Sequence, residues 1–352
     1  AGFPDSDVCG WSGVACASGE VKSLKLAAVD LGGFIEGTIP ETIGDLTRLS
    51  LLDLSSANMT GSLPSSMGDL VLLEDLLLSR NAFTSTLPVS LSKLSRLISL
   101  DVTLNRLSGT VPPGLTNIDS LMFLHLGSNA FTGAVPSGVV DIPFLIIFEA
   151  FGNQLTGPLP VGLDKLVYMF VFDVSDNQLT GTLPPTLGLL TSLISFVFTS
   201  NKINGTLPSS IGDMASLAFL EGSFNSLSGS IPTTLAGATS LQSFKMNNNK
   251  LTGPLPGDIG SLPLTNVYLG GNMLTGTVPR SLDTSLSVQY LYLQNNSLSG
   301  VLPFELCDSP LVVFFASGNE QLVCFAPCLA DVATQDFMSV VDECSPTCEL
   351  LL

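Results

Sequence analysis

The sequence predicts an α/β-type solenoid, a fold in which similar turns of chain stack and each turn contacts only its neighbours. The first observation is a proline that recurs ten times at an interval of 24 residues and then twice more at nearly the same interval. The second is a sequence motif that repeats around each proline. The third is the confinement of the cysteines to the two ends of the chain. A fixed period of this length is typical of a repeat architecture. The repeating prolines are Pro40, Pro64, Pro88, Pro112, Pro136, Pro160, Pro184, Pro208, Pro232, Pro256, Pro279 and Pro303.

One clean copy of the repeat runs from Leu97 to Pro112. Its first half, L-x-x-L-x-L-x-x-N-x-L, predicts a short strand that points alternate side chains into the core. We expect the asparagine that follows each strand to pair with backbone groups that a turning coil would otherwise leave without partners. Ala57 interrupts this series near its start. The series consists of Asn81, Asn105, Asn129, Asn153, Asn177, Asn201, Asn225, Asn249, Asn272, Asn296 and Asn319.

The second half of the repeat, L-x-G-x-[LIV]-P, is more specific. From about Cys9 to Asn319 the chain resembles the plant-type extracellular leucine-rich repeat family, which includes receptor-kinase ectodomains and polygalacturonase-inhibiting proteins. The opening Cys9-Gly10-Trp11-Ser12-Gly13-Val14-Ala15-Cys16 is similar to the end of that family's N-terminal cap. The helix that precedes this motif in the family is missing here, and the segment beyond Asn319 does not match the family's C-terminal cap.

The resemblance implies a leucine-rich repeat superhelix of about 12–13 turns of 24 residues. It places a parallel β-sheet on the concave face, short 3-10 helices and loops on the convex side, and disulfide-stapled caps at the ends. We expect one elongated domain with a cap at 1–20, repeats at 21–319 and a cysteine-rich cap at 320–352. It further implies a non-enzymatic module that binds its ligand along the concave face.

Composition narrows the classes of partner. Hydrophobic residues make up 45% of the chain and charged residues 12%, with a mean hydropathy of +0.49. No apolar run approaches the roughly 20 residues that span a bilayer, so we expect a membrane link only through a part not present here. The net charge of −18 disfavours nucleic acid and anionic membranes as partners, and it suits a basic partner or a neutral glycan.

The seven cysteines predict an oxidising compartment, because the terminal repeats need caps and disulfides stabilise such small caps in oxidising compartments. Cys9 and Cys16 form the pair that we expect, whereas the five C-terminal cysteines leave one free or bonded to another chain. A zinc site formed by Cys324, Cys328, Cys344 and Cys348 is the alternative. Three N-x-[ST] sequons, at Asn58, Asn204 and Asn295, agree with a secreted glycoprotein whose N-terminus, Ala1, has been processed. The C-terminal cysteines are Cys307, Cys324, Cys328, Cys344 and Cys348.

Outward positions of the predicted strands are free of the packing constraint, so unusual residues there indicate function. Three consecutive strands combine apolar and acidic side chains in a way that suits recognition of a peptide, protein or glycan. The alternative is that strands favour such residues in any case. The candidate ligand-binding residues are Asp101, Phe123, His125, Ile147, Glu149, Phe151, Val171 and Asp173. A second candidate, suited to sugar stacking, comprises Tyr268, Tyr290, Tyr292 and Phe315.

Enzyme and metal chemistry are weaker alternatives. Glu149 and Asp173 on adjacent strands could approach the carboxylate spacing of a retaining glycosidase, but an open concave sheet excludes no water. His125 is the only histidine and has no nucleophile motif beside it. Asp101, Glu149 and Asp173 could instead bind calcium. We expect no enzyme and no cofactor.

Three function classes remain. The first is an extracellular recognition module for a peptide, protein or glycan, and the second is a structural or adhesive component of a wall, matrix or surface assembly. The third is binding to an extended solid such as ice, for which one repeat position supplies threonines. We favour the first and place the second next, because a threonine-rich flank is the simpler interpretation of the third. The threonines at that position are Thr38, Thr86, Thr110, Thr182, Thr206 and Thr277, interrupted by Ser62, Ala134, Pro158, Ser230, Pro254 and Val301.

Overall fold

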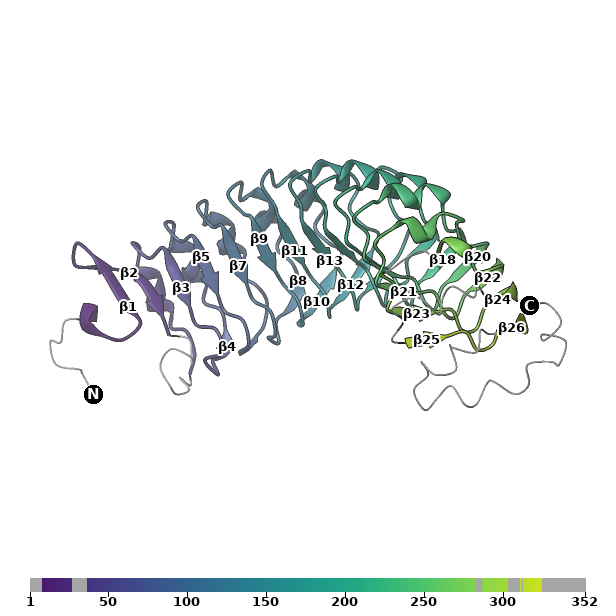
Figure 1. Cartoon of the computed structure of the whole chain (residues 1–352). Coiled ribbons are helices and arrows are strands. Elements are labelled where there is room, and N and C mark those ends of the chain that lie inside the picture. Colours follow the sequence, from purple (N-terminus) through teal and green to yellow (C-terminus); the bar gives the residue numbers. More distant parts are fainter. Residues whose placement is uncertain (1–7, 27–36, 283–286, 303–310, 312, 325–352) are drawn as a thin grey trace. The chain divides into compact units, whose positions relative to one another are not determined.

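The computed structural model describes residues 8–26, 37–282, 287–302, 311 and 313–324 (Figure 1). Within these residues a typical repeat contributes a strand to a main sheet, a second extended segment on the flank and a 3-10 helix. The predicted solenoid is therefore confirmed. The chain divides into two compact units, residues 1–178 and 179–352, and each is described by itself.

The main sheet of the N-terminal unit begins with β1 (Val14–Ala17), which pairs antiparallel with β2 (Glu20–Lys25). Every later described strand of this sheet is parallel to its neighbour, as stacked turns of one hand require. Those strands are β3 (Leu51–Asp53), β5 (Asp75–Leu77), β7 (Ser99–Asp101), β9 (Phe123–His125), β11 (Ile147–Glu149) and β13 (Val171–Asp173).

The flank and the opposite side of the N-terminal unit carry shorter elements. The flank strands are β4 (Thr60–Ser62), β6 (Ala82–Thr84), β8 (Ser108–Thr110), β10 (Ala130–Gly133) and β12 (Gln154–Gly157), and β14 (Gln178–Leu179) follows. The 3-10 helices are η1 (Val8–Gly10), η2 (Glu41–Asp45), η3 (Ser65–Asp69), η4 (Val89–Lys93), η5 (Pro113–Asn117), η6 (Ser137–Asp141) and η7 (Leu163–Lys165).

The C-terminal unit repeats this plan. Its main sheet contains β15 (Ser195–Val197), β17 (Phe219–Glu221), β19 (Ser243–Lys245), β21 (Asn266–Tyr268), β23 (Tyr290–Tyr292) and β25 (Val313–Phe315). Its flank strands are β16 (Asn204–Thr206), β18 (Ser226–Ser230), β20 (Lys250–Gly253), β22 (Met273–Gly276), β24 (Ser297–Val301) and β26 (Gln321–Cys324). Its 3-10 helices are η8 (Leu187–Leu189), η9 (Ser209–Asp213), η10 (Thr233–Gly237), η11 (Ile259–Ser261) and η12 (Arg280–Leu282).

The repeat from Leu97 to Pro112 shows how the sequence produces one turn. Leu97, Leu100 and Leu107 are fully buried, because each points inward against the same positions of the neighbouring turns. Pro112 stands directly before η5, and its carbonyl accepts a hydrogen bond of 3.1 Å from the amide of Leu115. Proline suits this place because its missing N–H is not needed at the start of a helical turn.

The asparagine series is buried or half-buried and is bonded as expected. Asn153 accepts a hydrogen bond of 2.9 Å from the amide of Phe131 and donates to the carbonyls of Leu126 and Ala150 at 3.1 Å each. One side chain thus links two adjacent turns and satisfies backbone groups that have no water nearby. Ala57 also occupies a fully buried position, so the interruption of the series leaves the core continuous.

The glycine of the L-x-G-x-[LIV]-P phrase lets the flank strands approach closely. Gly109 has a φ of +75°, and a β-carbon there would lie 2.7 Å from Cγ2 of Thr86 in the preceding repeat. Both the backbone conformation and the space therefore require glycine. The spacing of the phrase reflects contact between turns rather than a site for chemistry.

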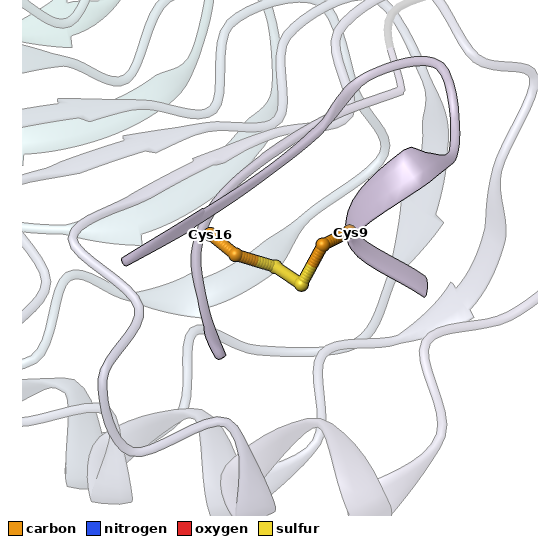
Figure 2. The surroundings of a disulfide bond; sticks show 2 residues. All are labelled: Cys9 and Cys16. Carbon is orange, nitrogen blue, oxygen red and sulfur yellow. A yellow bond between two sulfur atoms is a disulfide. The ribbon is translucent and has the colours of Figure 1, made fainter. Parts of the chain in front are cut away.

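The N-terminal end carries the predicted disulfide. Cys9, in η1, is bonded to Cys16, in β1, with 5.5 Å between their α-carbons (Figure 2). This bond ties η1 to the antiparallel pair that begins the main sheet. None of the helices in the described part of the chain is long and apolar enough to cross a membrane.

Candidate functional site

The outward positions of β7, β9, β11 and β13 form two rows that run across the strands, and together they are called the strand face below. Pairing register places Asp101, His125, Glu149 and Asp173 opposite one another in one row, which we call the acidic row. The other row joins Phe123, Ile147 and Val171 in the same way. All of these side chains are partly exposed. The structure therefore brings together the residues that the sequence selected.

The aspartates of the acidic row are held by their own strands. Oδ1 of Asp101 accepts hydrogen bonds from the amide of Thr103, at 2.9 Å, and from its hydroxyl. Oδ1 of Asp173 accepts the same two bonds from Ser175, at 2.9 and 2.6 Å. Such bonds to the residue two positions on are a common way to end a strand. They also fix the direction of each carboxylate.

Glu149 is one methylene longer and reaches a neighbour on another strand. Its Oε2 lies 2.6 Å from Nδ1 of His125, and the two side chains are 29% and 23% exposed. The imidazole of His125 is therefore the one side chain in the acidic row that can carry a positive charge. At the outward positions of β3 to β13, none of the residues is lysine or arginine.

Asp173 lies in the most desolvated part of the acidic row. Burial raises the pKa of its carboxyl, and the nearby charge of Glu149 raises it further, whereas the two bonds from Ser175 oppose the shift. The ionised form of Asp173 therefore lacks a compensating positive charge among the described residues around it.

Phe151 extends the strand face at the carboxyl end of β11. A β-carbon on Gly127 would lie 2.5 Å from Cε1 of Phe151, so the phenyl ring lies against the glycine of the preceding repeat. Gly127 makes room for the ring. The ring is held in place and stays partly exposed.

A second apolar group lies directly ahead of the strands and was missed by the sequence reasoning. Phe144, Tyr168 and Phe170 are 52%, 56% and 46% exposed, and the rings of Phe144 and Tyr168 are 6.1 Å apart. Backbone bonds of 2.8 and 2.9 Å join Phe170 to Ile146 and Ile146 to Met122. We call this group the entry patch; it comprises Ile98, Met122, Phe144, Ile146, Tyr168 and Phe170.

A sequence signal for the entry patch existed. Its members occupy the first and third positions before each strand. In this unit the third position holds Arg48, Leu72, Arg96 and Ser120 in the earlier repeats, and the first position is apolar from Ile98 onward. Aromatic residues enter these positions in two consecutive repeats. The strand-based interpretation considered only positions inside the strands and the residues just after them.

The second candidate group lies on the C-terminal unit. Tyr268, Tyr292 and Phe315 stand opposite one another on β21, β23 and β25, with ring centroids 4.3 and 5.0 Å apart. Tyr290 lies in the adjacent row. Because the three rings pack against each other, they leave less free ring surface for a sugar than separated rings would. Burial raises the pKa of both Tyr268 and Tyr292.

A charged pair continues this row. Lys245 Nζ lies 2.9 Å from Oε1 of Glu221 and 5.3 Å from the ring centre of Tyr268. The hydroxyl of Ser243 donates to the same carboxylate oxygen at 2.9 Å. The carboxylate of Glu221 is therefore paired with a lysine, whereas no carboxylate of the acidic row has a lysine partner among the described residues.

The alternatives of metal and enzyme chemistry gain no support. Across the described residues, no group of three or more histidine, cysteine, aspartate or glutamate side chains is arranged to hold a metal ion. Among the residues considered for calcium, Asp101, Glu149 and Asp173 each bond to a different neighbour. Glu149 bonds to His125, an arrangement that suits neither a free nucleophile nor an acid poised beside Asp173.

The remaining predicted positions have mixed outcomes. Asn58, Asn204 and Asn295 are exposed, so all three sequons are accessible, and their glycosylation stays a prediction. Cys307, Cys328, Cys344 and Cys348 lie outside the described residues, and only the backbone of Cys324 is described. Their pairing, the alternative zinc site and a bond to another chain remain predictions, as do the boundaries at 20 and 319.

The repeats, the asparagine series and the parallel sheet together define the class. The chain is a leucine-rich repeat protein whose repeats resemble those of plant extracellular proteins. The Leucine Rich Repeat family model matches residues 170–190, 240–262 and 287–309. No curated protein sequence matches the chain.

Solved structures extend the likeness over most of the chain. The PEPR1–AtPEP1 complex superposes with a TM-score of 0.78 and 29% identity, covering 93% of this chain and 52% of that one. The ectodomain of the Arabidopsis receptor kinase HAESA, in complex with an N-terminally extended IDA peptide hormone, superposes with a TM-score of 0.75 and 29% identity. The match covers 88% of this chain and 60% of that one. A plant ice-binding protein superposes with a TM-score of 0.58 and 28% identity, and the match covers 72% of this chain and 81% of that one. The chain thus spans little more than half the length of the receptor chains.

Proposed function

We propose that this protein is a non-enzymatic recognition module that binds a peptide or protein along the strand face of its N-terminal unit. The observation that carries the proposal is the alignment, on four paired strands, of partly exposed apolar and carboxylate side chains. Surfaces that combine apolar area with oriented polar groups are typical of recognition sites. The HAESA ectodomain, whose structure holds a peptide hormone, has the same fold.

A peptide or protein fits this surface better than a glycan. The aromatic rings that would stack on sugars lie on the C-terminal unit and pack against one another. The strand face instead offers aliphatic and aromatic side chains beside carboxylates. An extracellular location accords with the Cys9–Cys16 disulfide, since such bonds persist in oxidising compartments.

Two substitutions test the proposal. Glu149→Lys reverses a charge in the acidic row, and Phe151→Ala removes the ring that lies against Gly127. We expect both variants to lose at least tenfold in affinity for a ligand selected from a library of synthetic peptides, because both change the surface that it contacts. Asp119→Lys, at an exposed position outside the strand face, is the matched control and should bind normally. Unchanged circular dichroism shows that the variants fold. Full binding by both variants would refute the proposal.

The flank supports a second candidate function, binding to ice. Two uncharged columns rich in threonine and serine follow the flank strands, although Ala134, Pro158 and Pro254 interrupt one of them. Hydroxyl residues of adjacent repeats stand opposite one another, as in Thr110 with Thr132 and Thr206 with Ser228. Neighbouring strands lie about 4.8 Å apart, so the columns present hydroxyl and methyl groups at regular intervals. The plant ice-binding protein with the same fold supports this candidate.

The two candidates use different surfaces and can be separated. Thr110→Lys and Thr206→Lys should abolish inhibition of ice recrystallisation if the flank binds ice, because a charged side chain disrupts the regular array. Glu149→Lys should leave that activity unchanged. The absence of any effect of the wild-type protein on ice growth would eliminate this candidate and leave the recognition proposal intact.

A further inference from the structure

The entry patch is a surface feature that folding does not require. Three aromatic side chains, Phe144, Tyr168 and Phe170, are about half exposed and lie in two consecutive repeats. The two preceding turns carry Arg96 and Ser120 at the position of Phe144 and Tyr168, and those turns have the same backbone. Single exposed apolar residues are ordinary, but a contiguous group marks an interaction surface.

The entry patch continues directly into the strand face. Ile146 precedes Ile147, and Phe170 precedes Val171, so the patch borders the apolar row of Phe123, Ile147 and Val171. The acidic row lies on the far side of that apolar row, two residues further along each strand. The surface is therefore amphipathic across its width, with apolar groups at the start of the strands and carboxylates toward their carboxyl ends.

The carboxylates have acceptor capacity that the described residues do not use. Both bonds to Asp101 and both bonds to Asp173 go to Oδ1, and the bond to Glu149 goes to Oε2. Within the described residues, the second oxygen of each carboxylate accepts no hydrogen bond. Because the first oxygen is anchored, the second has a fixed position before any ligand arrives, which lowers the entropic cost of binding a donor.

Positive charge is scarce around these oxygens. His125 is already bonded to Glu149, and the outward positions of β3 to β13 contain no lysine or arginine. Burial raises the pKa of Asp173, which means that its ionised form would gain from a cationic neighbour. In the C-terminal unit the equivalent glutamate, Glu221, already has Lys245 as its partner.

We propose that the occupant of this surface is an extended peptide segment in which arginine side chains alternate with large apolar ones. The arginines meet Asp101, Glu149 and Asp173, and the apolar side chains cover the apolar row and the entry patch. This inference rests on the proposed function and names the chemistry of its ligand. Arginine suits the site because its planar guanidinium can bond to two carboxylate oxygens at once.

The geometry of an extended chain matches the rows. Side chains on one face of an extended peptide repeat about every 6.8 Å, while carboxylates on adjacent strands are about 4.8 Å apart. The four strands from β7 to β13 span about 14 Å, so a segment that crosses them can place three arginines along the acidic row. Its alternate side chains then point toward the apolar side of the surface.

Synthetic peptides test the proposal directly. A twelve-residue peptide of alternating arginine and leucine is the probe, and its affinity for the intact chain is measured by fluorescence anisotropy in low and high salt. One comparison peptide carries citrulline, which keeps the shape of arginine without its charge, and another carries serine in place of leucine. We expect either replacement to weaken binding at least tenfold.

Matched protein variants separate specific binding from general attraction to an acidic protein. Glu149→Gln and Asp173→Asn should each weaken the probe at least threefold, and Phe170→Ser should do so through lost apolar contact. Asp69→Asn removes the same charge from a 3-10 helix, and Val161→Ser alters a side chain that is 91% exposed. Both controls should bind the probe as the wild type does. Thermal unfolding of every variant confirms that it is folded.

The outcomes distinguish this inference from the proposed function. If the probe does not bind, or if Asp69→Asn weakens it as much as Glu149→Gln, the arginine-rich ligand is refuted. A library ligand whose binding depends on Phe151, but is unchanged when citrulline replaces its arginines, would also refute the arginine-rich ligand. The recognition function would then stand. If no ligand responds to any change on the strand face, both proposals fail.

Discussion

Nδ1 of His125 lies 2.6 Å from Oε2 of Glu149 on the next strand, and the two residues are 24 positions apart. The same separation joins Lys93 to Asp69 and Lys165 to Asp141, whose side chains are 57–62% exposed. One turn of the solenoid thus creates ion pairs at a fixed interval, and the surroundings decide how much each contributes. The pair in the acidic row is the less exposed one.

Double-mutant cycles should show this difference. We expect His125→Ala and Glu149→Ala to have a coupling energy of about 1 kcal/mol, because their bond is short and partly shielded from water. The exposed pair of Lys93 and Asp69 should couple by less than about 0.5 kcal/mol. Urea unfolding of the single and double variants gives both values. Equal coupling in the two cycles would mean that exposure does not determine the strength of these pairs.

The buried asparagines should be essential for stability. In Asn153→Ala the amide of Phe131 loses its partner, whereas the carbonyls of Leu126 and Ala150 each keep one bond, from Asn129 and Asn177. A buried backbone group left without a partner costs about 1–3 kcal/mol, so a loss of about 2 kcal/mol is expected. Asn117→Ala, at an exposed position of η5, is the control and should change the free energy of unfolding by less than about 0.5 kcal/mol. A loss below 1 kcal/mol for Asn153→Ala would contradict this account of the series.

The periodic part of this molecule was predictable because stacking imposes the same constraint on every turn. Inward leucines, the asparagine after each strand and the proline before each 3-10 helix each have one physical cause, repeated. The strand rows followed, since alternation along a strand and register between strands are both fixed. Asp101 and Glu149 were therefore correctly placed in one row from the sequence alone.

Side-chain direction was harder to predict. The aspartates turn toward hydroxyl and amide groups of their own strands, while Glu149 turns toward His125. The entry patch was missed because it lies outside the alternating positions of the strands. The tight packing of Tyr268 against Tyr292 also depends on rotamers that the sequence does not specify.

Replacing the repeating glycine should be costly for two separable reasons. Gly109→Ala forces alanine to a φ of +75° and places its β-carbon 2.7 Å from Cγ2 of Thr86. Backbone strain of about 1–2 kcal/mol adds to an overpacking cost of similar size. Adding Thr86→Ala should remove the overpacking alone and recover about 1 kcal/mol.

The control for this series is Gly257→Ala, where no atom lies within 4 Å of the added carbon and the φ is ordinary. Its free energy of unfolding should change by less than about 0.5 kcal/mol. Full recovery in the double variant would show that the positive φ contributes no strain, and no recovery would show that the methyl contact is unimportant.

Loss of the disulfide should act locally. Cys9→Ala with Cys16→Ala opens a short loop, for which chain entropy predicts a stabilisation of about 2.5 kcal/mol. Because β1 lies at the end of the main sheet, we expect faster hydrogen exchange in β1 and β2 and little change beyond β5. Mass-spectrometric exchange measures this. Uniform loss of protection along the N-terminal unit would instead show that the cap governs the stability of the whole unit.

Asp173→Asn should stabilise the protein at neutral pH. Burial raises the pKa of Asp173 in the folded state, so its ionised form opposes folding at pH values above that pKa. As the pH falls through the folded pKa, the native carboxyl takes up a proton first and the penalty disappears. The gain in melting temperature should therefore be largest near pH 7 and vanish below the unfolded pKa of about 3.9. Asparagine keeps an oxygen that can accept the bonds from Ser175.

The net charge of −18 requires a matched control, because removing any negative charge reduces repulsion in this protein. Asp119→Asn removes one charge from an exposed position of the same unit. We expect Asp173→Asn to raise the melting temperature more than Asp119→Asn at pH 7, with the difference shrinking toward pH 3. A lower melting temperature for Asp173→Asn at pH 7 would mean that the charge itself strengthens the bonds from Ser175 by more than its burial costs.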